Sequence, residues 1–271
     1  MSESLKGYEN AKKQYQVCDQ LSNNASIHCA ALIITEKPKL SKNGSLIPIG
    51  PTHELRNGTL TFVKTGAKVY GITCWHVIEY FRKQIAASGD DYSYSMQTMV
   101  NGFYDVADRF IRPEPQYGDP KVDIAIRELK SEFVSAIGKM PIDLDQASNM
   151  PIQIEFGLAV GYPESIKYSK YEEGNTGYRI SMPQVEILAE INNLPNRRFT
   201  LFSELPNTPE HSEYSGMSGG PIFWSREDFY GIYGVIYEGG LGSEGTTDNS
   251  TVYVYGELAT PEIIRDWISQ V

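Results

Sequence analysis

Apolar residues fall in short runs from Ala25 onward, and turn residues separate one run from the next. The runs are rich in β-branched and aromatic residues, which indicates strands. Their residue ranges are 27–35, 58–63, 69–73, 96–103, 122–126, 158–163, 185–191, 198–202, 221–224, 230–237 and 251–255. Because no long helices alternate with these strands, the pattern favours antiparallel β-barrels or a β-sandwich over an α/β fold.

Helical spacing replaces the strand pattern at both ends of the chain. Residues 1–24 are polar and mixed in charge, and their few apolar residues recur at helical spacing, which predicts a short helix in an N-terminal arm. The chain ends on a predicted helix over 261–270, where Thr260 can serve as the N-cap and Pro261 suits the first position. One or two further helical turns are expected after His76.

A connection in the middle of the chain divides the strands into two groups. A predicted short helix over 132–140 and the irregular segment 141–150 make up this connection. We therefore expect three parts, namely an N-terminal arm of residues 1–24, a first β-barrel of residues 25–140, and a second β-barrel of residues 141–271 that ends in the terminal helix.

Composition and charge exclude several functions. The 271 residues are 41% hydrophobic and 21% charged, which is ordinary for a globular protein, and the formal net charge is −10. An acidic surface repels phosphate groups, so nucleic acid is not expected as a partner. The N-terminus lacks a secretory signal pattern and no stretch is apolar enough to span a bilayer, so we expect a cytoplasmic protein with no membrane contact. Three scattered cysteines do not suggest a disulfide framework.

The segment with the clearest chemical character is the turn over 215–221, in which three glycines and a proline surround Ser218. Glycine permits positive φ and lets a second backbone approach closely, so the turn can expose the serine hydroxyl. It can also aim the N–H groups of Gly216 and Ser218 at one developing oxyanion. A plain glycine-rich hairpin turn has the same composition, and the segment also fits the loose G-x-S-x-G pattern of α/β-hydrolases.

A serine nucleophile at neutral pH requires a base, and the base requires an acid that orients it. Every histidine of the chain precedes Ser218: they are His28, His53, His76 and His211. The α/β-hydrolase order places the histidine after the serine, so it is excluded. The subtilisin order needs an aspartate before the histidine, and the only one before His76 is Asp19 in the predicted arm. The order histidine, aspartate, serine is favoured.

Asp123 is the best placed of the aspartates between His76 and Ser218. It lies in the apolar run 122–126, whereas the others lie in polar, loop-like stretches. An unpaired carboxylate is too costly to bury, so Asp123 either faces solvent or has a partner. His76 is the obvious partner.

Three motifs occur in this order along the chain: TCWHV at 73–77, DIAI at 123–126 and GMSGGP at 216–221. They resemble the segments around the base (T-A-A-H-[CV]), the acid (D-[IL]-A-[LV]) and the nucleophile (G-[DN]-S-G-G-P) of the chymotrypsin/trypsin-like serine proteases, most closely the bacterial, non-secreted branch. The separations of 47 residues (123 − 76) and 95 residues (218 − 123) also suit this family.

This resemblance implies an all-β fold of two antiparallel six-stranded β-barrels of the chymotrypsin type with a C-terminal helix. It implies a trypsin-like serine endopeptidase in which His76 takes the proton of Ser218 and Asp123 orients the imidazole, the first barrel carrying His76 and Asp123 and the second Ser218. The N–H groups of Gly216 and Ser218 would bind the tetrahedral oxygen. The substrate would be a protein or peptide, and neither a cofactor nor a metal ion would be needed.

The chain departs from the family's pattern at three places. Met217 replaces the acidic residue that animal trypsins pair with a newly cut N-terminus, and no I-V-G-G-like sequence occurs, so we expect an enzyme that folds active or is controlled by other means. Val77 stands where secreted relatives have a cysteine, which fits a reducing compartment. The serine that supports the acid in the family would align at Ile236 or Tyr237, so this support of Asp123 is missing.

The resemblance also indicates where a specificity pocket would lie. Its base maps near Ser212, and the other candidate pocket residues are Glu213, Tyr237 and Glu238. The acidic residues of this region favour a basic side chain in the substrate. Residues 1–24 are a candidate segment for docking a regulatory partner protein, because a cytoplasmic protease must be restrained.

Three other functions stay open. The first is a zinc site, for which His28, Cys29, Cys74 and His76 offer ligands, although adjacent strand residues point to opposite faces. The second is a catalytically silent binding module with a protease fold, because a fold does not prove a function. The third is an esterase that uses the same triad.

Overall fold

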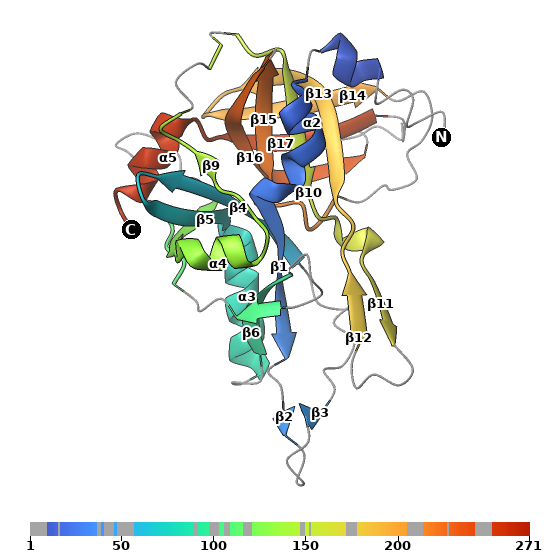
Figure 1. Cartoon of the computed structure of the whole chain (residues 1–271), viewed down its shortest axis with the longest axis vertical. Coiled ribbons are helices and arrows are strands. Elements are labelled where there is room, and N and C mark those ends of the chain that lie inside the picture. Colours follow the sequence, from blue (N-terminus) through green and yellow to red (C-terminus); the bar gives the residue numbers. More distant parts are fainter. Residues whose placement is uncertain are drawn as a thin grey trace.

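A computed structural model describes residues 10–15, 17–36, 39–40, 46–47, 57–88, 92–97, 103–105, 109–115, 121–146, 150–151, 153–171, 178–204, 214–226, 228–241 and 251–271. Within these ranges the chain is mostly β, as the sequence pattern predicts, and it forms two strand assemblies. A barrel occupies the upper part of Figure 1, and a sheet with one long helix lies below it.

The strands of the second half close into a six-stranded barrel, in the order β10–β13–β14–β17–β16–β15. Their bounds are Phe156–Gly161 (β10), Val185–Leu194 (β13), Arg198–Glu204 (β14), Pro221–Arg226 (β15), Phe229–Leu241 (β16) and Thr251–Leu258 (β17). All neighbouring strands are antiparallel, and closure leaves no free edge. The prediction of a six-stranded barrel in this half is confirmed.

Within the described residues the strands of the first half form a seven-stranded sheet, and its closure into the expected barrel is not confirmed. The path is β7–β6–β1–β4–β5–β8, and β9 pairs with β4 in parallel. The bounds are Cys29–Glu36 (β1), Asn57–Thr65 (β4), Lys68–Cys74 (β5), Tyr92–Gln97 (β6), Phe103–Asp105 (β7), Ile124–Leu129 (β8) and Ile142–Asp143 (β9). Within the described ranges no ladder joins β7 to β8. The outer edge of β8 bonds instead to Ile111, which exchanges two backbone hydrogen bonds with Ile126.

Two short hairpins extend from these assemblies. They pair β2 (Lys39–Leu40) with β3 (Leu46–Ile47), and β11 (Tyr168–Tyr171) with β12 (Tyr178–Ser181). Both lie at the lower end of the view in Figure 1, away from the barrel.

The helices are few. They are α2 (Asp19–Asn24), α3 (Trp75–Ser88), α4 (Ser131–Ala136) and α5 (Pro261–Ile268), with 3-10 turns at Ala25–His28 (η1) and Glu164–Ile166 (η4); residues 10–14 are also helical. Helix α5 ends two residues before the predicted end, and the Thr260 hydroxyl accepts from Ile263 N as expected of an N-cap. No described helix combines the length and the apolar character that a membrane span requires.

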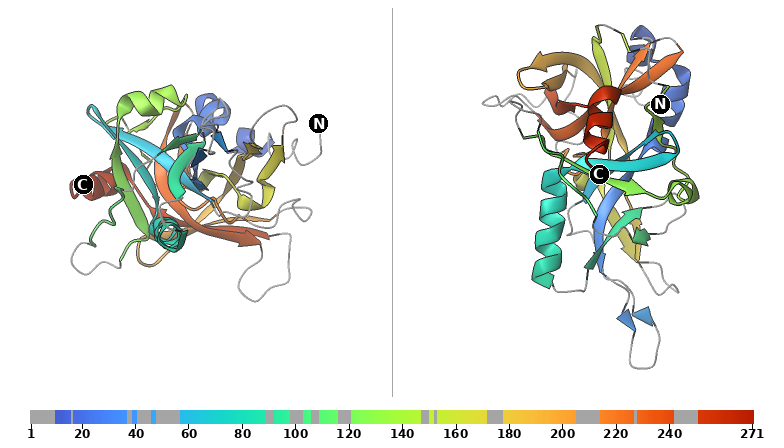
Figure 2. Two further views of the ribbon diagram at one scale, coloured as in Figure 1. Left: turned by 90° about the horizontal axis from the view of Figure 1, so that it is seen from below. Right: turned by 90° about the vertical axis from the view of Figure 1, so that its left-hand side faces the viewer.

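Helix α3 has 14 residues, which is longer than the one or two turns that the sequence indicated. It lies along the outside of the sheet as a separate rod (Figure 2). Val77, Ile78 and Phe81 are buried on one face and pack with Leu60 and Phe62 of β4. This apolar face stabilises the whole helix against the sheet and so sets the position of its first turn.

A shared core joins the sheet to the barrel. It contains Ile33 and Ile72 of the sheet, Leu158 and Phe223 of the barrel, and the fully buried Leu21 of α2. The N-terminal segment is held at two further points, where Tyr15 stacks on Phe156 and where Cys18 N donates to Ser225 Oγ at 2.8 Å. The boundaries of the three predicted parts stay a prediction.

His28 predicts how stability depends on pH. The ring is buried, with Nδ1 2.8 Å from the Met140 carbonyl oxygen and Nε2 2.9 Å from the Tyr230 hydroxyl. Burial lowers the pKa of His28, and the charge of Lys139 adds to the shift. The unfolded chain therefore binds a proton near pH 6.5 that the folded chain resists, so stability is lost as the pH falls from about 6.5 toward the folded pKa.

The measurement is urea unfolding of the wild type and His28→Gln at about pH 7.5 and pH 5.5. We expect the wild type to lose more stability on acidification than the variant. Equal losses in the two proteins would contradict the assignment to His28.

Candidate active site

His76 lies in the first turn of α3, directly after the end of β5. Pairing of β5 with β8 sets Cys74 opposite Ile124, so Asp123, one residue before β8, lies beside the start of the helix. The Asp123 carbonyl oxygen accepts from Trp75 N at 3.2 Å, and carboxylate Oδ1 accepts from His76 N at 3.0 Å. Asp123 thus satisfies N–H groups that a helix start leaves unpaired, and its charge is favourable there.

The other carboxylate oxygen of Asp123 meets the imidazole of His76. Oδ2 lies 2.5 Å from Nδ1, and the His76 side chain is 49% exposed. This contact favours the tautomer that carries its proton on Nδ1, which leaves Nε2 as an acceptor. Asp123 is therefore paired with His76, and it lies just before β8 rather than inside a strand as its apolar run suggested.

Ser218 lies in the turn that enters β15, next to the start of α3. Its carbonyl oxygen accepts from Thr59 N of β4 at 2.8 Å. An added Cβ at Gly58 would lie 2.6 Å from Val77 Cγ1 and 3.4 Å from the Ser218 carbonyl oxygen. Gly58 is therefore close both to the serine turn and to the residue that follows His76. Ser218 Oγ donates to the Tyr237 carbonyl oxygen at 3.2 Å, and within the described ranges no hydrogen bond joins it to His76.

The N–H groups of Gly216 and Ser218 have no acceptor within the described part of the chain, whereas those of Met217, Gly219 and Gly220 are bonded. Met217 N donates to Tyr214 O, Gly219 N to Ile236 O and Gly220 N to Met217 O, at 3.1, 2.7 and 2.8 Å. The two unpaired N–H groups are those that the resemblance assigns to an oxyanion hole. They are available to an incoming oxygen.

Met217 anchors this turn in the barrel. Its side chain is fully buried in the cluster that includes Ile222 and Val254, and a Cβ at Gly161 would lie 2.9 Å from Met217 Cβ. An acidic side chain could not occupy this apolar site unpaired. The methionine that replaces the acidic residue of the trypsin motif therefore fits its apolar surroundings.

Cys74 lies between Asp123 and strand β16. Its thiol donates to the Ile236 carbonyl oxygen at 3.0 Å, and Sγ is within 4.8 Å of the ligand atoms of His76 and Asp123. Burial raises the pKa of the Cys74 thiol well above its ordinary value, and the charge of Asp123 raises it further. The thiol therefore stays protonated and acts as a hydrogen-bond donor.

The four residues of the zinc alternative do not gather at one point. Cys74 and His76 lie together with Asp123, and this is the only cluster of three or more such groups within the described ranges. Both ring nitrogens of His28 have other partners, and burial raises the pKa of Cys29 to about 12. The predicted four-ligand set is therefore not assembled.

Of the four predicted pocket residues, the structure describes two. Tyr237 is half-buried and Glu238 is exposed, and they follow an irregularity in the pairing of β16 with β17. Ser212 and Glu213 lie outside the described residues.

A partly buried ion pair lies beside Tyr237. The guanidinium of Arg198 lies 4.6 Å from the centre of the Tyr237 ring, and its Nε lies 3.4 Å from Glu257 Oε2. Burial raises the pKa of Glu257, although Arg198 acts against this shift. Nothing in the sequence motifs pointed to this pair, because its two members meet only through the pairing of β14 with β17.

Sequence reasoning also missed three side chains of β4. Asn57, Thr59 and Thr61 are buried and donate to carbonyl oxygens of the turn around Ser218. Polar residues at every second position of an otherwise apolar strand are the pattern that could have identified them.

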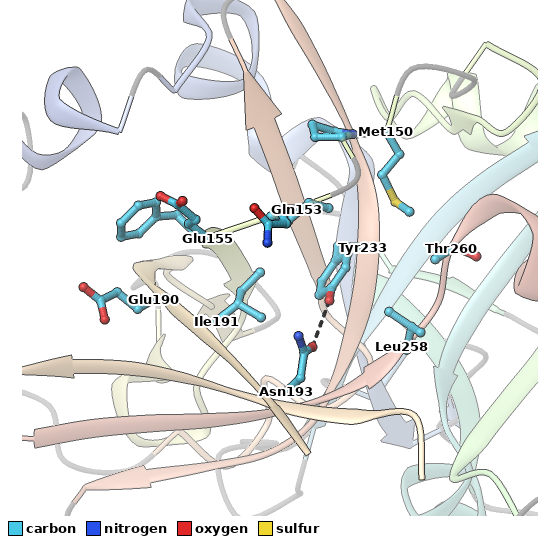
Figure 3. Close-up of a pocket in the computed structure, with 12 residues that line it drawn as sticks. Met150, Gln153, Glu155, Glu190, Ile191, Asn193, Tyr233, Leu258 and Thr260 are labelled. Atoms are coloured by element: carbon cyan, nitrogen blue, oxygen red, sulfur yellow. Dashed lines mark hydrogen bonds between the residues drawn. The ribbon is translucent and has the colours of Figure 1, made fainter. Parts of the chain in front are cut away.

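The structure also contains a hollow on the six-stranded barrel, and its lining includes none of His76, Asp123 and Ser218. Figure 3 shows its lining, in which Tyr233 Oη donates to Asn193 Oδ1 at 3.2 Å and Glu155 and Glu190 supply acidic groups. Its described lining includes neither histidine nor serine. The hollow therefore differs from the site at Ser218 and His76, which combines a serine with a histidine.

No protein-family model matches the chain, and no curated protein matches its sequence. The crystal structure of the thermostable serine protease AL20, from an extremophilic microorganism, is similar with a TM-score of 0.51 and 14% identity, covering 91% of this chain and 97% of that one. Protease Anisep from Arthrobacter nicotinovorans has a TM-score of 0.47 and 15% identity, covering 90% and 94%. The likeness to AL20 shows that this chain has a serine-protease-like fold; it shows the fold alone.

Gly216→Ala tests how tightly the turn is held. Gly216 has φ of +95°, and an added Cβ would lie 2.7 Å from Tyr162 O and 2.9 Å from Glu164 N. Strain and overlap with backbone atoms should together lower the free energy of unfolding by about 2 kcal/mol or more, measured by urea denaturation. Gly66→Ala is the control, because Gly66 also has positive φ but open space around it, and about 1 kcal/mol is expected. Equal losses would show that crowding at Gly216 is unimportant.

Proposed function

We propose that the protein is a serine endopeptidase that uses His76, Asp123 and Ser218. One arrangement carries the proposal: the His76–Asp123 pair, with Nδ1 and Oδ2 2.5 Å apart, stands beside a serine turn that offers two unpaired N–H groups. The fold shared with a serine protease agrees with it. Each component occurs in other proteins, but together they supply a base, an orienting acid, a nucleophile and an oxyanion site.

The reaction would proceed through an acyl-enzyme. His76 Nε2 takes the proton of Ser218 Oγ as the oxygen attacks the peptide carbonyl, and the N–H groups of Gly216 and Ser218 bind the resulting oxyanion. The imidazolium then gives its proton to the leaving amine as the C–N bond breaks. Water repeats the steps on the ester, and its proton passes through His76 to Ser218.

The Ser218 hydroxyl changes its partner in this mechanism. Its hydrogen bond to the Tyr237 carbonyl oxygen, at 3.2 Å, is long for a hydroxyl donor and is readily exchanged for one to Nε2. In the proposed mechanism the hydroxyl would make this exchange by rotation about its Cα–Cβ bond, while the turn's backbone stays in place. Bonds to the base are often loose without substrate, so this geometry is compatible with catalysis.

The finer features of the proposal concern substrate and control. The exposed carboxylate of Glu238, together with Glu213 near the base of the pocket at Ser212, would favour substrates with a basic side chain. A partner protein docked through residues 1–24 would restrain the protease in a cytoplasmic setting.

A fluorophosphonate probe tests the proposed chemistry. We expect the wild type to be labelled at Ser218, and labelling to be abolished in Ser218→Ala and His76→Ala. In Asp123→Asn the rate of labelling should fall about 10⁴-fold, as in other triad hydrolases, because the imidazole then loses the acid that orients it. Ser135→Ala, at an exposed position in α4, is the control and should label like the wild type.

The same proteins, incubated with a peptide library and analysed by mass spectrometry, distinguish the rival functions. Cleavage by the wild type and not by Ser218→Ala supports the endopeptidase. A labelled protein that hydrolyses p-nitrophenyl acetate but cleaves no peptide would be an esterase. Absence of labelling under all conditions would favour the silent binding module.

A further inference from the structure

Strand β4 presents a row of buried polar side chains to the turn that carries Ser218. Asn57, Thr59 and Thr61 occupy alternate positions, so they share one face of the strand, and they are 5%, 0% and 0% exposed. Within an antiparallel sheet such positions are usually apolar. This row therefore needs partners, and the turn provides them.

Each side chain of the row donates to the turn or to the segment beside it. Thr59 Oγ1 donates to Gly216 O at 3.0 Å and Thr61 Oγ1 to Gly219 O at 2.7 Å. Asn57 Nδ2 donates to Tyr162 O at 2.7 Å and lies 3.5 Å from Gly216 O. The strand backbone adds a bond from Thr59 N to the Ser218 carbonyl oxygen at 2.8 Å.

Thr59 also links the turn to the segment after β10. Its hydroxyl accepts from Tyr162 N at 3.2 Å while it donates to Gly216 O, so it uses both of its roles. Two residues further on, Glu164 N donates to Ser215 O at 2.6 Å. The peptide units before and after Gly216 are thus both held by their carbonyl oxygens.

The peptide units before and after Ser218 are also held by hydrogen bonds to their carbonyl oxygens. The carbonyl oxygen of Met217 accepts from Gly220 N at 2.8 Å, and that of Ser218 accepts from Thr59 N. A peptide unit is planar, so a fixed carbonyl fixes the direction of the N–H in the same unit. The peptide units that carry the Gly216 and Ser218 N–H groups are therefore fixed by Glu164 N and Gly220 N. Strand β4 fixes the units on both sides of the Ser218 N–H, at the carbonyl oxygens of Gly216 and Ser218.

The amide of Asn57 shows that the row is arranged for donation. Its Oδ1 is buried and has no hydrogen-bond partner among the described residues, whereas Nδ2 faces two carbonyl oxygens. An unpaired buried acceptor is unfavourable, and a well-packed apolar residue would avoid it. The donor at this position is thus kept at a cost in stability.

We propose that Asn57, Thr59 and Thr61 are positioning residues that hold the Gly216 and Ser218 N–H groups ready for the oxyanion. The inference rests on the proposed serine-hydrolase function. It assigns to a strand of the sheet the task of preorganising a turn of the barrel. None of the three side chains needs to touch the substrate.

Thr59→Val is the decisive variant, because valine keeps the shape and removes the hydroxyl. Labelling by a fluorophosphonate separates two quantities, the affinity of the reversible complex (KI) and the maximal rate of labelling (kinact). We expect kinact to fall about 10- to 100-fold, which is at most the effect of removing one oxyanion donor. KI should change by about twofold or less. Thr59→Ser should restore kinact to within about threefold of the wild type, since it restores the hydroxyl.

Thr65→Val is the matched control, because Thr65 lies on the same strand and its hydroxyl donates to Asp145 Oδ1, away from the turn. Its kinact should equal that of the wild type. Asn57→Asp and Thr61→Val repeat the test at two further positions in case Thr59→Val does not fold. In Asn57→Asp a carboxylate oxygen would face the carbonyls of Tyr162 and Gly216, so kinact should fall there as well.

Hydrogen exchange of residues 214–220 provides a second measurement that needs no catalysis. We expect faster exchange of the Met217, Gly219 and Gly220 amides in Thr59→Val than in Thr65→Val. Unchanged kinact and unchanged exchange in a folded Thr59→Val would overturn the inference. A wild type without labelling would instead contradict the proposed function, while the exchange measurement would still decide the role of the row.

Discussion

Buried carbonyl groups of the 214–220 turn impose the constraint on which the site depends. A buried carbonyl that lacks a donor costs about 1–3 kcal/mol, so each needs a partner that approaches from a defined direction. Donors come from β4 through Thr59 and Thr61, from the segment after β10 through Glu164 N, and from the turn itself through Gly220 N. Once these bonds form, the turn has little freedom, and glycine is required at its most crowded points, Gly219 and Gly220, where an added Cβ would lie 2.1 Å from Thr59 O and from Val160 O.

Asp123 and His76 meet the same requirement at the start of α3, where N–H groups need partners. Asp123 satisfies the unpaired N–H groups there and holds the imidazole of His76 with its remaining oxygen. In chymotrypsin/trypsin-like proteases a serine supports the acid; Ile236 and Tyr237 stand at the matching positions here, and Asp123 instead bonds to the helix start. Both carboxylate oxygens of Asp123 are thus bonded without that hydroxyl.

The strands were largely predictable from the sequence, because runs of β-branched and aromatic residues mark them without long-range information. Each predicted run overlaps a strand of the structure, and the run at 96–103 corresponds to two short strands, β6 and β7. Strand order was less accessible. Whether the first half closes depends on which segment takes the edge of β8, and Ile111 does so from a stretch with no clear pattern. The length of α3 was underestimated because its support comes from packing on β4.

The chemical motifs led to the candidate site residues but not to what holds them. His76, Asp123 and Ser218 stand in short motifs that can be interpreted locally, whereas Thr59 and Gly216 are 157 residues apart and meet only in the fold. Alternation at Asn57, Thr59 and Thr61 is visible in the sequence, but its meaning depends on which surface that face of β4 contacts.

The backbone and the side chains of the site have different tasks, which explains why many hydrogen bonds surround only a few reactive atoms. The backbone of the turn is held at the carbonyls of Ser215, Gly216, Met217, Ser218 and Gly219. Within the described ranges, the Ser218 hydroxyl has one long bond and Nε2 of His76 has none. Groups that bind a developing charge act best when they need no rearrangement, while a nucleophile must move to react. A rigid turn with one weakly bonded hydroxyl meets both conditions, because most of the hydrogen bonds hold the backbone atoms that stay in place.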